Sequence, residues 1–177
     1  HSPKDIIKEG VALITEDRKV TGLNLSGSVN DNIAMVAIKK LLSHGLYNKN
    51  KARAASMEYI KKLNIKTPSG DQITGNLSGG NQQKIVIAKW LLNDPDIIIL
   101  DEPTRGIDVG AKRDIYLLLG KLVQQGKAVI MISSEIPELM GVCDRIMVMC
   151  EGNLSGEVQR DAFSQERIMT LASAIEV

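Results

Sequence analysis

The sequence predicts an α/β fold with a mostly parallel sheet flanked by helices and with an inserted helical subdomain. The first observation is that short, continuous apolar runs at 97–101, 128–133 and 145–149 alternate with helical patterns. Strands of this kind belong to parallel sheets that are covered on both faces. The second observation is that residues 28–74 carry only helix and loop signals, which predicts the inserted subdomain.

Local signals predict the order of the elements. Ser2 followed by Pro3 indicates a helix start, and Gly10 and Gly45 are expected to end helices. Helical spacing of apolar residues marks the helices, and uninterrupted apolar runs mark the strands. The predicted elements are helices at 3–9, 28–43, 49–63, 78–92, 111–124, 137–140 and 164–172, strands at 11–14, 97–101, 128–133, 145–149 and 154–158, and a polar loop at 15–19.

These elements suggest how the chain is organised. We expect residues 28–92 to form the helical subdomain, including the helix at 78–92, and residues 1–27 and 93–177 to form parts of the α/β core. A length of 177 residues suffices for one domain with a substantial core.

The composition is that of an ordinary globular domain. Hydrophobic residues make up 44% and charged residues 24%, and the net charge is +1, which gives no reason to propose a nucleic-acid surface. The apolar runs are too short to cross a membrane, and the chain does not open with a signal-peptide pattern. Two cysteines, Cys143 and Cys150, fit a reducing compartment, where the simplest reading is that they are small buried residues.

The most informative stretch is residues 77–84, Leu-Ser-Gly-Gly-Asn-Gln-Gln-Lys, at the start of a predicted helix. Ser78, Gly79 and Gly80 would offer free backbone N–H groups, a hydroxyl and no obstructing Cβ atom, so a phosphate could approach the positive helix end. The alternative is a glycine-rich turn with an ordinary serine cap. Ser-Gly-Gly alone is a weak signal, whereas the whole stretch followed by an acidic strand end is a strong one.

Two carboxylates, Asp101 and Glu102, end the apolar strand at 97–101. Open α/β sheets bind ligands at this edge. One carboxylate could hold Mg²⁺, usually through water, while its neighbour orients or deprotonates an attacking water. The alternative is an acidic loop that caps a buried strand. Together with residues 77–84, the pair indicates nucleoside triphosphate chemistry.

The third part of such a site, a loop of the Gly-x4-Gly-Lys-Ser/Thr type, does not occur in the sequence. The nearest stretch, 120–128, has one residue too many between its glycines, lacks the hydroxyl and lies at a helix end instead of a helix start. We therefore expect nothing else in the chain to grip the α and β phosphates.

These motifs resemble those of ATP-binding cassette ATPases, and more closely the second cassette of the fused two-cassette ATPases of bacterial ribose, galactose and xylose importers. Residues 77–84 match the signature motif and residues 97–103 match Walker B. The D-loop region falls at 104–110, the switch position at Ser134 and the Q-loop position at Glu16. The resemblance implies a P-loop NTPase fold whose N-terminal strands and Walker A loop are missing, as in a truncated domain.

The resemblance also implies ATP and Mg²⁺ as cofactors and head-to-tail pairing with a second cassette, in which each signature motif completes the other's ATP site. The implied partners are transmembrane permease subunits, touched by the helical subdomain and the loop near Glu16, and indirectly a sugar-binding protein. The implied location is cytoplasmic, at the inner face of the cell membrane. The implied site residues are Glu102 as the catalytic residue, Asp101 at the metal, and Ser78, Gly79, Gly80, Asn81, Gln82, Glu16, Asp108 and Ser134 at the nucleotide.

Three positions depart from the usual cassette pattern: Glu16 and Asn81 each stand where the family has glutamine, and Ser134 stands where it has histidine. Serine carries no charge near neutral pH and reaches less far than an imidazole. We therefore expect this cassette's own site to be slow or non-hydrolytic, and hydrolysis to occur on ATP held by the partner cassette. The change at Asn81 is mild, because an amide is kept.

Two other functions stay open at this point. One is a cassette ATPase of another class, acting in DNA repair or on the ribosome, although such proteins carry long coiled-coil or basic arms that this sequence lacks. The other is a non-catalytic interaction module, because a chain without a P-loop should bind ATP weakly by itself. Missing strands would also leave sheet edges uncovered, so we expect the fragment to associate with itself.

Overall fold

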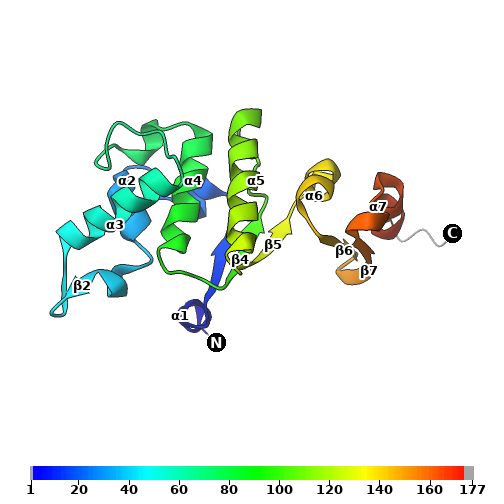
Figure 1. The fold of residues 1–177 in the computed structure, drawn as a ribbon, viewed down its shortest axis with the longest axis horizontal. Coiled ribbons are helices and arrows are strands. Elements are labelled where there is room, and N and C mark those ends of the chain that lie inside the picture. The colour runs from blue at the N-terminus through cyan, green and yellow to red at the C-terminus, as the bar shows by residue number, and fades with distance from the viewer. Residues whose placement is uncertain (1, 174–177) are drawn as a thin grey trace. The chain divides into compact units, whose positions relative to one another are not determined.

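The computed structural model describes residues 2–173. The chain divides into two compact units, of which the first ends at Ile132 and the second begins at Ser133. Figure 1 labels most of their helices and strands.

The first unit is built on a parallel sheet. Its strands are β1 (Val11–Ile14), β4 (Ile97–Asp101) and β5 (Ala128–Ile132), paired in the order β1-β4-β5. In the register, Ile14 lies opposite Leu100, and Leu100 lies opposite Met131. The carboxyl ends of β1 and β4 therefore lie at the same edge of the sheet, and the loops that follow them start side by side.

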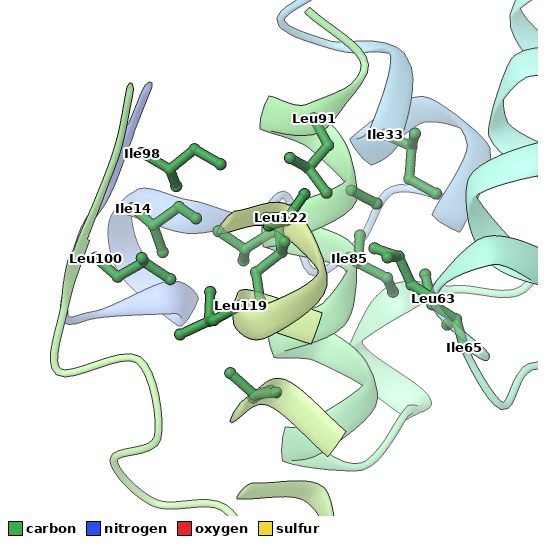
Figure 2. Close-up of a cluster of buried hydrophobic side chains, with 14 of the residues drawn as sticks. Ile14, Ile33, Leu63, Ile65, Ile85, Leu91, Ile98, Leu100, Leu119 and Leu122 are labelled. Atoms are coloured by element: carbon green, nitrogen blue, oxygen red, sulfur yellow. The ribbon is translucent and has the colours of Figure 1, made fainter. Parts of the chain in front are cut away.

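Only one face of this sheet is buried. Ile14, Ile98 and Leu100 point from the strands toward α4 (Gly79–Leu91) and α5 (Val109–Gln124), as Figure 2 shows. On the opposite face, Ile130 is 52% exposed and Ile132 is 50% exposed. The expectation that both faces are covered is therefore wrong for this chain. The strands are uniformly apolar, as in a doubly covered sheet, but apolar side chains on the second face, such as Leu13, Ile130 and Ile132, are exposed.

The helix α4 forms the centre of the first unit. Ten of its 13 residues are buried, because α5 and the sheet pack on one side and α2 (Val29–Ala34) and α3 (Lys49–Lys62) pack on the other. A single core cluster joins Ile33 and Leu63 to Ile85 of α4 and to the strands (Figure 2). The hydrophobic core thus continues across the predicted boundary between residues 92 and 93. That residues 28–92 form a separate subdomain remains a prediction.

The predicted helix at 28–43 is wrong after its first turns. The helix α2 ends at Ala34 and is followed by the 3₁₀-helix η2 (Ile38–Leu41) and by a small hairpin of β2 (Leu42–Ser43) and β3 (Leu46–Tyr47). The turn of this hairpin uses His44 at φ 52° and Gly45 at φ 81°. Gly45 therefore makes a hairpin turn and does not cap a helix.

Packing explains this difference. Some of the apolar residues that define the helical spacing are buried and others are not. Leu41 is buried with Ala34 and Ala52, whereas Ile38 is 48% exposed. Residues 28–74 therefore contain strand as well as helix, including an isolated bridge between Ser28 and Ile73.

Short elements complete the first unit. The helix α1 (Pro3–Lys8) begins with a capping box between Ser2 and Asp5, as the sequence predicts for its start. The polar loop after β1 contains a π-helical turn, η1 (Arg18–Gly22), and a 3₁₀ turn, η3 (Thr74–Asn76), precedes α4.

The second unit is a hairpin covered by helices. It contains α6 (Ile136–Val142), β6 (Arg145–Cys150), β7 (Asn153–Gln159), η4 (Arg160–Ala162) and α7 (Gln165–Ala172). The strands β6 and β7 pair antiparallel around a turn at residues 151–152. In β6, Ile146 and Val148 are buried whereas Met147 and Met149 are exposed, so the run at 145–149 is a one-sided hairpin strand and not the doubly covered parallel strand that was predicted.

Candidate functional site

The acidic end of β4 turns sharply. Glu102 has φ 45°, its N–H donates to the carbonyl of Ile132 at 2.9 Å, and its own carbonyl accepts from the N–H of Arg105 at 3.1 Å. A left-handed backbone is unfavourable for a residue with a side chain, and such strain tends to occur at functional sites. The turn leaves Asp101 and Glu102 at the carboxyl edge of the sheet, as the sequence predicts.

The carboxylates at this edge of the sheet could supply some, but not all, of the ligands of a Mg²⁺ ion. Among residues 2–173, no group of three or more His, Cys, Asp or Glu side chains could enclose a metal ion. Mg²⁺ is usually held by one or two carboxylates, with phosphate oxygens and waters completing its shell. One carboxylate such as Asp101 therefore fits a magnesium ion that is shared with a phosphate ligand.

The D-loop region continues from this turn into α5. Thr104 is buried, Gly106 has φ 67°, and Asp108 is the N-cap of α5, with its Oδ1 accepting from the N–H of Ala111 at 2.9 Å. The Asp108 side chain is exposed, so it is accessible to a partner while it stabilises the helix start. The resemblance implied a place at the nucleotide for Asp108 and did not indicate this capping role.

The signature motif begins α4 with a serine that is not used as a conventional cap. The Ser78 side chain accepts no hydrogen bond from the first-turn backbone, and its Oγ instead accepts from Asn81 Nδ2 at 2.9 Å. Asn81 Oδ1 accepts from the N–H of Lys66 at 2.7 Å. Gln82 is buried and donates to the carbonyl of Leu77 at 3.1 Å. Asn81 and Gln82 thus hold the loops around the helix start, so any contact they make with nucleotide stays a prediction.

The two glycines of the motif are required by packing inside the chain. A Cβ atom on Gly80 would lie 2.4 Å from the Cβ of Ala111. A Cβ atom on Gly79 would lie 2.7 Å from Nη2 of Arg18 and 3.2 Å from the carbonyl oxygen of Gly106. The structure therefore brings the first turn of α4 against the D-loop and the first turn of α5. Sequence reasoning explained these glycines by the approach of a phosphate and missed the intramolecular reason.

The Q-loop position joins the same cluster. The side chain of Glu16 forms an ion pair with Arg105, and Arg18 donates from Nη1 to the carbonyl of Arg105 at 3.0 Å and from Nη2 to that of Gly106 at 3.3 Å. A shallow pocket of about 260 Å³ lies between these side chains and Lys19. Neither arginine was selected from the sequence. The adjacency of β1 and β4 could have indicated that their loops meet.

Two buried lysines were also missed. Lys84 of the signature motif donates to Asp114 of α5 at 2.7 Å and to the carbonyl of Asn64 at 3.2 Å. The hydrogen bond from Lys84 holds the pKa of the Asp114 carboxyl below its usual range. Lys89 donates to the carbonyl of Gly22, and burial lowers the pKa of its ammonium group. Both lysines connect α4 to its neighbours.

The switch position lies in the second unit. Ser134 is exposed in the segment before α6, next to Ser133, whose hydroxyl donates to Glu138 and accepts from the N–H of Glu135 at 3.1 Å. The first unit therefore carries the signature motif, the Walker B end, the D-loop and the Q-loop position. Ser134, at the switch position, belongs to the second unit.

These features define the class of protein. A family model described as ABC transporter matches residues 5–105, more than half of the chain, and the chain belongs to this family. Among solved structures, a dimeric ATP-binding cassette in a post-hydrolysis state bound to ADP and Pi superposes with a TM-score of 0.75 at 24% identity, covering 92% of this chain and 69% of that one. This similarity shows the fold, and the predicted fold class is confirmed.

Curated relatives are more similar in sequence. The ribose import ATP-binding protein RbsA of Clostridium tetani is 55% identical over 174 residues, covering 98% of this chain and 34% of that protein. The protein of the same name from Yersinia pestis is 46% identical over 175 residues, covering 99% of this chain and 34% of that protein. The chain thus spans about a third of the length of these relatives. Within the part that the structure describes, no helix is both long and apolar enough to span a bilayer.

Proposed function

We propose that this chain is part of the energy-coupling ATPase of a bacterial monosaccharide importer and contributes to ATP sites formed between two cassettes. The sequence similarity to ribose import ATP-binding proteins supports the transport role. The observation that carries the proposal is that the signature helix start packs on the D-loop, where Gly79 lies against Gly106, and on the first turn of α5, where Gly80 lies against Ala111. These contacts join the two motifs assigned to the cassette interface into one surface.

The signature surface would bind the terminal phosphate of ATP held by the partner cassette. Ser78, Gly79 and Gly80 present backbone N–H groups and a hydroxyl at the first turn of α4, which carries a partial positive charge. The first turn of α5, capped by Asp108, lies directly beside it. Asn81 and Gln82 support this surface by holding the adjacent loops in place.

The Walker B end would serve the site that forms with this cassette's own Walker A loop. Asp101 would hold Mg²⁺, which neutralises phosphate charge when bound. Glu102 would orient the attacking water or accept its proton. Ser134 at the switch position supplies no imidazole, and Glu16 at the Q-loop position is paired with Arg105. These features support a slow or non-hydrolytic site on this side and hydrolysis at the partner's site.

The remaining parts of the proposal concern location and partners. The cassette would act in the cytoplasm at the inner face of the cell membrane, together with permease subunits that contact the helical subdomain and the segment around Glu16. A sugar-binding protein would act indirectly, through the permease. The name of the ribose import ATP-binding proteins that the chain resembles supports a role in import.

The test uses the full-length two-cassette ATPase that carries this sequence. Ser78→Asp places a negative charge where the phosphate would approach, and we expect ATP hydrolysis to fall at least about tenfold, equivalent to about 1.4 kcal/mol in the barrier. Asn76→Asp is the matched control, because it adds the same charge to the exposed turn before the motif. Glu102→Gln is expected to reduce hydrolysis by less than half. If Ser78→Asp leaves activity intact while Glu102→Gln abolishes it, the proposed division between the two sites is reversed.

A further inference from the structure

The π-helical turn η1 is attached to the C-terminal half of α4. Lys89 of α4 donates to the carbonyl of Gly22, the last residue of the turn. Gly22 also packs against Val86, because a Cβ atom at position 22 would lie 3.2 Å from Cγ2 of Val86. Asp17 fixes the other end of the turn, with Oδ1 accepting from the N–H groups of Lys19 and Val20 at 2.9 and 3.1 Å. The turn is therefore a defined support and not a loose loop.

The guanidinium of Arg18, the first residue of this turn, contacts both the D-loop region and the signature motif. Arg18 Nη1 and Nη2 donate to the carbonyls of Arg105 and Gly106 in the D-loop region. Nη2 also lies 2.7 Å from the point where a Cβ on Gly79 would stand, so the guanidinium is packed against the first residue of α4. Because a guanidinium is planar and rigid, these contacts fix the orientation of two successive peptide groups relative to the signature helix.

These bonds are not needed to hold α4 and α5 together. Gly80 packs directly on Ala111, and Lys84 pairs with Asp114 further along the same two helices. Arg18 instead holds an exposed segment, since Arg105, Gly106 and Asp108 are all exposed. Its own Nε is buried without a hydrogen-bond partner among residues 2–173, an arrangement that is unfavourable for stability. The exposed residues that Arg18 holds and the unpartnered Nε together indicate that Arg18 shapes the accessible surface and does not serve mainly to stabilise the core.

We propose that Arg18 is a positioning residue for ATP hydrolysis, which keeps the D-loop and the signature motif at a fixed separation on the cassette interface. The inference rests on the proposed function, because it requires that this surface closes on nucleotide held by a second cassette. Arg18 acts through its contacts with Gly106 and Gly79. Its loss lets the D-loop move independently of α4, so the closed arrangement is reached less often.

The experiment compares three variants of the full-length two-cassette ATPase. Arg18→Gln removes the bidentate fork, Arg18→Lys keeps the charge without the fork, and Lys19→Gln removes a neighbouring exposed charge as the matched control. We expect Arg18→Gln to lower kcat at least about tenfold with a change in the KM for ATP of less than about threefold. Arg18→Lys should recover only a small part of kcat, because one ammonium group cannot reproduce the paired geometry. Lys19→Gln should keep at least half of kcat.

A second measurement tests the geometry directly. Hydrogen exchange of the backbone amides from Gly106 to Asp108 should be faster in Arg18→Gln than in Lys19→Gln, while the melting temperatures of the two variants agree within about 2 °C. Equal kcat values for Arg18→Gln and Lys19→Gln would overturn the inference. So would a loss of kcat that is matched by a general loss of thermal stability, or an equal rise in KM, since those results indicate a structural or a binding role.

The Ser78→Asp variant separates this inference from the proposed function. If Ser78→Asp abolishes hydrolysis and Arg18→Gln does not, the positioning role is wrong and the composite site stands. If Ser78→Asp also keeps full activity, the composite site itself is wrong.

Discussion

Gly80 in α4 packs against Ala111 in α5 so closely that a Cβ atom at position 80 would stand 2.4 Å from the methyl group of Ala111. The first turns of the two helices therefore lie directly against each other. This contact places the signature motif beside the D-loop. Glycine at position 80 is required by this packing, whatever ligand approaches the helix start.

The first prediction concerns this contact. Gly80→Ala should destabilise the chain by about 1–3 kcal/mol, the usual range for forcing an extra methyl group into a packed site. Adding Ala111→Gly should restore part of that loss, because the two methyl groups then no longer compete for one space. Urea denaturation of the wild type, both single variants and the double variant measures the coupling.

The matched control for that prediction is Gly120→Ala, which lies in α5 with nothing within 4 Å of the added Cβ. We expect Gly120→Ala to be neutral or to stabilise by up to about 1 kcal/mol, because alanine favours helix. Strictly additive effects of Gly80→Ala and Ala111→Gly would contradict the direct contact.

The second prediction separates two roles of Asp108. Asp108→Ala removes the acceptor that caps α5 and should cost about 1 kcal/mol of stability, whereas Asp108→Asn keeps an acceptor and should cost little. If Asp108 also serves the cassette interface through its charge, Asp108→Asn should reduce ATP hydrolysis of the full-length protein without lowering its melting temperature. Asp108→Asn with unchanged hydrolysis would leave the residue with only its capping role.

The third prediction concerns the pH dependence of the Lys84–Asp114 pair. The pKa of Asp114 is lowered in the folded chain by the hydrogen bond from Lys84, so the pair stabilises the fold above the unfolded value of about 3.9. That contribution is lost as pH falls through the depressed folded pKa. Asp114→Asn should therefore destabilise by about 1 kcal/mol at pH 7, with the difference from the wild type shrinking below about pH 4.

Denaturation midpoints measured between pH 2.5 and 7 test this behaviour, and Asp71→Asn is its control. Asp71 pairs with Arg53 on the surface, where both side chains are more than half exposed. Its loss should change stability by less than about 0.5 kcal/mol at any pH. A pH-independent effect of Asp114→Asn would mean that its charge does not stabilise the fold.

The fourth prediction concerns the uncovered sheet face. Ile130 and Ile132 expose apolar surface on β5, an edge strand of the sheet, so the isolated 177-residue chain should associate with itself. Ile130→Lys should shift the chain toward monomer in sedimentation velocity experiments, and Leu46→Lys, at an exposed position on β3, should not. A monomeric wild-type chain at high concentration would contradict this expectation.

Much of the fold and of the candidate site could be predicted from local sequence. The start of α1 follows from Ser2 and Pro3, and the apolar run at 97–101 ends in the acidic pair at the sheet edge, as predicted. The helix predicted at 28–43 failed, because its spacing of apolar residues is compatible with helix, but Leu41 is buried while Met35 and Ile38 are exposed. Periodicity shows which residues could share a face, and it does not show whether another element covers that face.

The sequence by itself determined the chemistry available to this protein: the Ser-Gly-Gly helix start, the Asp101–Glu102 pair and their order along the chain, all of which are local patterns of residue type. Only the tertiary structure decided what these groups touch. The contact of Gly80 with Ala111 and the bonds from Arg18 to the D-loop join residues more than 30 positions apart. The physical reason is that such contacts depend on which strands pair and how closely helices pack, and neither is encoded in the spacing of neighbouring residues.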